Sequence, residues 1–153
     1  MVKPEIVAKY YLGLSPGKEI IDWANEIFLK RKDIDEDFIH QLAFLDQGDP
    51  WETARAETVF FDHFNMKEDE IQDAIKRYFL ALLEGIVAGK RDLYELVDTV
   101  SRIEDTCGHP EWIHELSGFC VYLMPDSTLI PNSGLAIEIE KTIEELKQAL
   151  TVS

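Results

Sequence analysis

One stretch of the chain, residues 71–88 (IQDAIKRYFLALLEGIVA), constrains the fold more than any other. Its apolar residues recur at steps of three and four, which is the spacing of one stripe along an α-helix. The stripe comprises Ile71, Ile75, Phe79, Leu82 and Ile86. From Tyr78 onward it widens until Glu84 is the one charged residue before Gly89. Because a helix that is apolar nearly all round belongs inside a protein, we expect a central helix, about residues 67–88, within an all-α domain.

Periodic apolar segments and helix-start signals extend this prediction along the chain. Short loops between the segments favour antiparallel neighbours, and a row formed by Ala81, Gly85 and Ala88 would let a neighbouring helix approach closely. The segment 136–140 alternates in the manner of a short strand, so a strand at that point is the alternative to the last helix. We therefore predict a single domain, residues 1–153, with seven or eight helices at about 4–12, 16–32, 36–46, 50–64, 67–88, 90–107, 110–124 and 135–150.

The clearest local signal is Asp49-Pro50-Trp51-Glu52. It combines an aspartate cap, a proline at the first helical position and a glutamate three residues after the cap. The helix that begins here runs to about Phe64. Helical spacing places four of its residues on one face: Trp51, Ala54, Thr58 and Phe61.

The charge balance limits the classes of partner. The chain has 30 acidic and 15 basic residues, a net charge of −15. Affinity for nucleic acid, like affinity for an anionic membrane surface, comes from lysine and arginine, so we expect neither partner. A basic protein would instead be attracted, although many acidic proteins are acidic only for solubility. No signal peptide is recognisable and no apolar run reaches about 18 residues, so we expect a cytoplasmic protein with reduced cysteines.

The negative charge is concentrated in one region. Residues 33–73 hold thirteen acidic and two basic residues, a net charge of −11. Several of the acids stand where helix caps are expected, which is a sufficient structural reason for them. Caps do not require Glu57, Asp62 or Asp73. We predict a partner-binding surface in this region, composed of Asp35, Glu36, Asp37, Asp46, Glu57, Asp62, Asp69 and Asp73.

Residues with metal-ligand chemistry gather further along, at Asp105, Cys107, His109, His114 and Cys120. Thiolates and imidazoles are the usual ligands of zinc. However, no C-x-x-C pair is present, and six positions separate His114 from Cys120, so they project from different sides of a helix. Cys120 also stands in an apolar run, where a thiol behaves as a small hydrophobic group. We expect no metal and no cofactor, with a metal site here as the alternative.

Glu84 and the Asp62-His63 pair are further candidates for an acid or a base. Glu84 stands in the most apolar helix, where burial would raise its pKa, but one edge of a central helix often reaches solvent. Asp62 and His63 are adjacent, yet successive helical positions point about 100° apart, so a surface histidine is the simpler interpretation. The sequence has no phosphate-binding glycine loop, no H-E-x-x-H and no G-x-S-x-G. No motif argues for an enzyme.

One stretch resembles a known family. The resemblance rests on Glu104-Asp105, the run His109 to Ile113 (HPEWI), Phe119, and Val121-Tyr122-Leu123-Met124-Pro125. These residues are similar to the closing signature of domain of unknown function 2247, a family of small helical bacterial proteins. Leu123 interrupts the expected Tyr-Met pair, and Gly108-His109 replaces aromatic residues. Such families are similar to immunity proteins encoded beside toxins, which implies that the chain neutralises a basic toxin by binding it. An enzyme using Asp105, Cys107, His109, His114 or Glu84 is one alternative, and a self-assembling subunit, such as a homodimer, is another.

Overall fold

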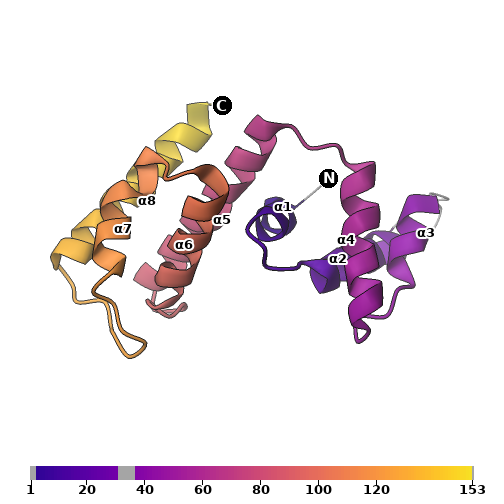
Figure 1. Cartoon of the computed structure of the whole chain (residues 1–153), viewed down its shortest axis with the longest axis horizontal. Helices are drawn as coiled ribbons and strands as arrows, with labels where there is room; N and C mark the ends of the chain where they lie inside the picture. The colour runs from indigo at the N-terminus through magenta and orange to yellow at the C-terminus, as the bar shows by residue number, and fades with distance from the viewer. Residues whose placement is uncertain (1–2, 31–36, 153) are drawn as a thin grey trace. The chain divides into compact units, whose positions relative to one another are not determined.

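The computed structural model describes residues 3–30 and 37–152. Every regular element within those ranges is a helix, which confirms the all-α class. The structure holds eight α-helices in this part of the chain, in agreement with the predicted seven or eight (Figure 1). Their bounds are α1 Pro4–Tyr11, α2 Gly17–Lys30, α3 Asp37–Ala43, α4 Pro50–His63, α5 Glu68–Val87, α6 Glu95–Cys107, α7 His114–Cys120 and α8 Gly134–Val152, with a short 3-10 helix, η1, at Glu111–Ile113.

The chain divides into two compact units, Met1–Ile71 and Gln72–Ser153, which we call the first and the second unit. The division falls within the first turn of α5. That helix has nearly the predicted limits, Glu68–Val87 against about 67–88. The single domain over residues 1–153 stays a prediction.

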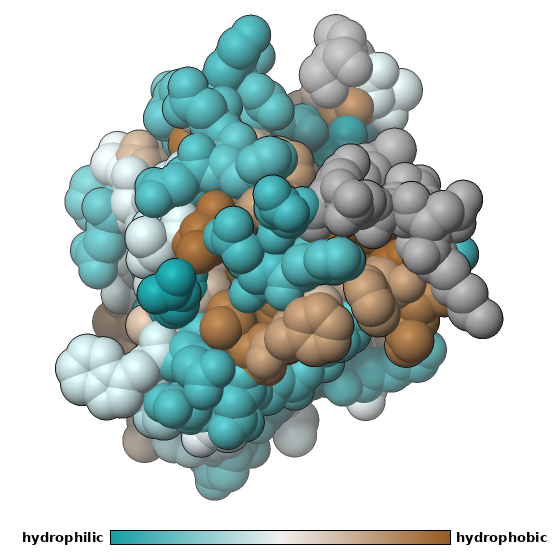
Figure 2. Space-filling view, turned by 90° about the vertical axis from the view of Figure 1, so that its right-hand side faces the viewer, coloured by the Kyte–Doolittle hydropathy of each residue, from teal (hydrophilic) through white to brown (hydrophobic). Residues whose placement is uncertain are grey.

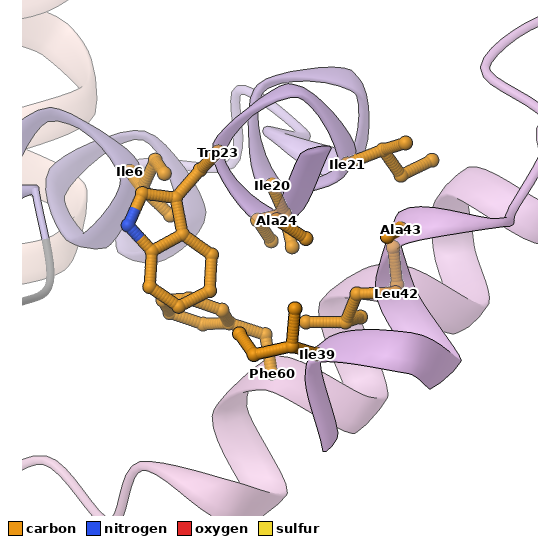
Figure 3. Close-up of a cluster of buried hydrophobic side chains, with 10 residues drawn as sticks. Ile6, Ile20, Ile21, Trp23, Ala24, Ile39, Leu42, Ala43 and Phe60 are labelled. Carbon is orange, nitrogen blue, oxygen red and sulfur yellow. The ribbon is translucent and has the colours of Figure 1, made fainter. Parts of the chain in front are cut away.

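The core of the first unit is built from apolar side chains of α1 to α4 (Figure 3). α2 supplies the largest share, with Ile20, Trp23 and Ala24 buried as their spacing predicts. Trp23 meets Phe60 of α4 edge to face, with ring centroids 5.3 Å apart. Aromatic pairs of this geometry contribute about 0.5–1.5 kcal/mol beyond the area that they bury. The tertiary arrangement of α2 and α4 therefore depends on a few large rings.

The start of α4 follows its predicted signal, with one difference. The Asp49 side chain accepts a hydrogen bond from the Trp51 backbone N–H at 2.9 Å, so the aspartate cap is confirmed. In a capping box the glutamate would accept from the backbone of Asp49. Glu52 Oε1 instead accepts from the backbone N–H of Asp46, at 3.1 Å. The glutamate thereby fastens the turn before the helix rather than the cap itself.

The packed face of α4 lies opposite Trp51. Thr53, Ala56 and Phe60 face inward, and the backbone of Thr53 lies directly against Gly17 of α2. Trp51 lies about 180° around the helix from Phe60 and points into solvent. Ala54 and Thr58, which were grouped with Trp51, are exposed as well, and Phe61 is half-buried.

The second unit contains most of α5 together with α6, α7 and α8. Leu82, Leu83 and Ile86 of α5 are buried, whereas Ala81 and Ala88 are exposed, so one edge of this helix reaches solvent. The small-residue row does not serve a neighbouring helix. A Cβ atom at Gly85, the third residue of that row, would lie 2.5 Å from Cγ of Arg91, so the glycine makes room for that side chain.

Of two helix ends that were predicted in the second unit, one agrees with the structure and the other does not. Gly108 ends α6 in the left-handed conformation, as its position predicts. α7 ends at Cys120 rather than near Met124, because the chain tightens there into hydrogen bonds between residues three apart. The segment 136–140 lies within α8, so the strand that was considered there is not formed.

Candidate functional site

The outward face of α4 carries an exposed stripe at helical spacing, and it is the main candidate site. Trp51, Arg55, Thr58 and Asp62 follow one another on this face and are all exposed. Trp51 is 85% exposed, an unusual position for the largest apolar side chain. Eleven helical steps separate Trp51 from Asp62, about 16 Å along the axis. The stripe is therefore an elongated surface on one rigid element.

The turn between α3 and α4 continues this surface. Phe44, directly after α3, is 71% exposed. Asp46 follows it, also exposed, and its Oδ1 accepts the backbone N–H of Gly48 at 2.8 Å. Figure 2 views the molecule from the side on which α3 and α4 lie, where apolar side chains reach the surface among hydrophilic ones. We call the set Phe44, Asp46, Trp51 and Asp62 the α4 surface.

The carboxylates of the α4 surface are not neutralised by the chain itself. Within the described residues, Asp46 and Asp62 make no ion pair, and Asp37 at the start of α3 makes none either. The ion pairs that the structure describes in the first unit involve α1, Lys3 just before it, and α2 instead. They are Lys3 with Glu26 at 3.5 Å, and Lys9 with Glu5 at 3.2 Å and with Glu19 at 3.1 Å. The carboxylates of Asp46 and Asp62 are therefore available to an outside partner, on a surface that also carries the exposed Arg55.

The other residues of the predicted partner-binding surface have different surroundings. Asp35 and Glu36 lie outside the described residues. Glu57 is half-buried on the flank of α4, where burial and the nearby Glu19 raise its pKa above the ordinary value. Asp69 accepts the backbone N–H of Glu70 at the start of α5. Asp73 belongs to the second unit and pairs with Arg77 at 2.9 Å.

Asp62 and His63 act independently, as their helical angle implies. The ring of His63 stacks on Phe38 of α3, with centroids 3.8 Å apart and planes at 12°. Asp62 lies on the exposed stripe, about 100° away around the helix. The histidine therefore belongs to the aromatic packing between α3 and α4 rather than to an acid–base pair.

In the second unit, one carboxylate organises the stretch that was considered for a metal. Glu104 Oε2 lies 2.6 Å from Nδ1 of His109, and Glu104 Oε1 accepts a hydrogen bond from Ser117 Oγ at 3.0 Å. His109 adopts a positive φ of 57° in the turn after α6. Glu104 thus ties α6, the turn and α7 together. Sequence reasoning missed Ser117 entirely and noted Glu104 only through the family resemblance.

The arrangement around Glu104 does not have the order that nucleophilic catalysis needs. A base must lie between the nucleophile and the orienting carboxylate, but here the carboxylate lies between His109 and Ser117. Burial, followed by the proximity of Glu104, raises the pKa of Cys120 to about 11. The thiol is therefore protonated at neutral pH and is a weak nucleophile. Among the described residues, no three or more His, Cys, Asp or Glu side chains are placed to hold a metal ion.

Glu84, the carboxylate of the apolar helix, lies on the exposed edge of α5. Its Oε2 is 3.7 Å from Nζ of Lys147 on α8. Since both side chains are about half exposed, this pair contributes little to stability, of order 0–1 kcal/mol. The burial on which a role as acid or base depends is not present at Glu84.

Long apolar helices are a further class of functional element. In the described part of the chain, no helix has both the length and the apolar character of a membrane span.

Comparison with known proteins adds no family: no protein-family model, curated protein or solved structure matches this chain.

Proposed function

We propose that this chain is a non-catalytic binding protein whose α4 surface binds a basic protein. The observation that carries the proposal is Trp51, 85% exposed on a stripe that it shares with an unpaired carboxylate. Tryptophan is among the residues that most often dominate binding energy at protein interfaces. Phe44 supplies a second exposed ring beside the acidic turn.

The charges define the partner's chemistry. Asp46 lies in the turn before α4 and Asp62 lies near the end of that helix, and both are available to lysine and arginine side chains of a partner. Charges at the rim of an interface mainly accelerate encounter and select partners, whereas buried aromatic anchors supply most of the affinity. A partner with a basic surface and an apolar pocket for an indole ring fits both features.

The resemblance to the family of domain of unknown function 2247 narrows the proposal to a toxin with a nuclease-like basic surface. In that case the carboxylates would take the place of substrate phosphates and pair with the toxin's lysine and arginine side chains. That step rests on the resemblance, and the binding of a basic protein does not depend on it.

The proposal is tested by capturing partners at low salt from a lysate of the cells that make the protein, with wild type and Trp51→Ala as baits. We expect one basic protein on the wild-type bait. Removing the indole should weaken its binding by at least about 2 kcal/mol, roughly 30-fold in Kd. Tyr122→Ala is the matched control, because Tyr122 is 82% exposed in the second unit. Capture of no basic protein, or equal loss with both variants, would overturn the proposal.

A further inference from the structure

The second unit contains a pocket that plays no part in the α4 surface. Its volume is about 490 Å³, within the range of sites that bind small molecules. The end of α5, the turn after it, the loop before α8 and the first turns of α8 form its walls. Because all of these elements belong to the second unit, the pocket is defined within that unit alone.

The walls of the pocket combine aliphatic and polar side chains, and the aliphatic ones continue to the surface. Ile86 and Leu93 are buried. Val87 and Ile137 line the pocket as well, yet are 47% and 59% exposed. Ile130, 66% exposed, stands between the lining residues Leu129 and Pro131. Aliphatic side chains thus extend from the interior of the pocket to its rim, which suits a ligand with an apolar body.

The positive charge in the pocket is already balanced. Arg91 Nε donates to Glu95 Oε2 at 2.7 Å, and this bond is the main reason why the pKa of Arg91 is raised. Tyr78 interacts with the same guanidinium group. The side chain of Arg91 is further fixed by its close fit over Gly85. An anionic ligand would have to compete with Glu95 for a cation that is held in place.

The negative charge in the pocket is not balanced. Asp92 uses Oδ1 to accept the backbone N–H of Tyr94 at 3.0 Å, which leaves its second oxygen for a ligand. Glu140, on α8, is exposed and makes no ion pair within the described residues. The pocket therefore offers carboxylates from two walls beside an aliphatic surface.

From these features we infer that the pocket binds a small organic ammonium cation with an apolar body. The apolar body lies against Ile86, Leu93 and Ile137, and the ammonium group is directed to Asp92 and Glu140. This site is independent of the proposed function, because it lies in the other unit and requires no basic protein.

The inference is tested by methyl NMR of the whole chain with three probes of similar size: 2-phenylethylammonium, 2-phenylethanol and phenylacetate. We expect the cation to shift the methyl signals of Ile86, Leu93 and Ile137. The alcohol, which lacks the charge, should bind about two- to fivefold more weakly, the factor that exposed ion pairs provide. Phenylacetate should bind more weakly still. Equal binding of the three probes, tighter binding of phenylacetate, or no shift with any of them would overturn the inference.

Two variants test whether Asp92 and Glu140 bind the ammonium group. Glu140→Gln and Asp92→Asn should each weaken binding of the cation about two- to fivefold and leave binding of the alcohol unchanged. Asn at position 92 can still accept the bond from Tyr94. Glu144→Gln is the matched control, since Glu144 is exposed on α8 but does not line the pocket. If Glu144→Gln weakens binding as much as Glu140→Gln, only the general charge of the unit matters and the assignment of the pocket is wrong.

Discussion

Helices α2 and α4 approach closely at Gly17, and this contact yields a quantitative prediction. A Cβ atom built there would lie 2.4 Å from the carbonyl oxygen of Thr53 and 2.7 Å from its Cβ. Such atoms essentially never approach within 3.0 Å, so α2 and α4 would have to separate by about 0.6 Å. The obstacle is backbone on a packed helix, which cannot simply rotate away.

For Gly17→Ala we therefore expect a net loss of about 1.3 kcal/mol, within a range of roughly 0–2.6 kcal/mol. Overpacking of this kind costs about 1–3 kcal/mol. Replacing glycine by alanine also lowers the conformational entropy of the unfolded chain, which stabilises the folded protein by about 0.4–1 kcal/mol. The same substitution at Gly118, within α7, has nothing within 4 Å of the new Cβ atom. It should stabilise the protein by up to about 1 kcal/mol, the difference in helix propensity between glycine and alanine.

Urea unfolding measures whether each substitution lowers or raises the free energy of unfolding. In a Trp51→Phe/Trp112→Phe background, fluorescence of the buried Trp23 reports on the first unit, and far-UV circular dichroism follows the whole chain. The midpoint should move to lower urea for Gly17→Ala and to higher urea for Gly118→Ala. A stabilising Gly17→Ala would show that the backbones of α2 and α4 are farther apart than described, and would refute the reasoning.

Three further predictions concern single side chains. The folded protein holds the proton of Glu57 more firmly than the unfolded chain, so ionisation costs stability as the pH rises through and above the ordinary pKa of 4.5. Glu57→Gln should therefore stabilise the protein at neutral pH and have little effect below about pH 4, as thermal unfolding across pH would show. In a Cys107→Ser background, Cys120 should be alkylated at neutral pH about a hundredfold more slowly than a thiol with a pKa of 9.0, with a pH–rate midpoint near 11. An ordinary rate would contradict the described burial. Asp49→Ala removes the cap that accepts the Trp51 N–H and should cost about 1 kcal/mol in urea unfolding, whereas Asp49→Asn should restore most of it.

Local signals explain why most helix limits could be predicted. The bounds of α5 and the start of α4 depend on periodicity and capping, which act within a few residues of the chain. The face that α4 buries depends instead on Gly17, more than thirty positions earlier. With aromatic residues on both sides of α4, no local pattern could decide between Trp51 and Phe60.

For the candidate sites as well, some features could be predicted from the sequence and others could not. The acidic character of residues 33–73 could be read from composition, but not which carboxylates stay unpaired. Asp73 meets Arg77 one turn later, an ion pair that its spacing allows, while Glu57 turns toward α2. The pocket in the second unit could not be predicted at all. It forms where an irregular loop meets α5 and α8, and no sequence periodicity describes such a meeting.

We propose that the α4 surface attracts a basic partner through its carboxylates. The most direct measurement is the affinity for the captured partner at low and high salt, with wild type and with Asp46→Lys/Asp62→Lys. As a control with the same change in net charge, Glu144→Lys/Glu115→Lys alters two exposed residues of the second unit. We predict that reversal on the α4 surface lowers the affinity at low salt and flattens its salt dependence, because rim charges steer association. The control should retain both. An unchanged affinity and salt dependence after reversal at Asp46 and Asp62 would contradict the account.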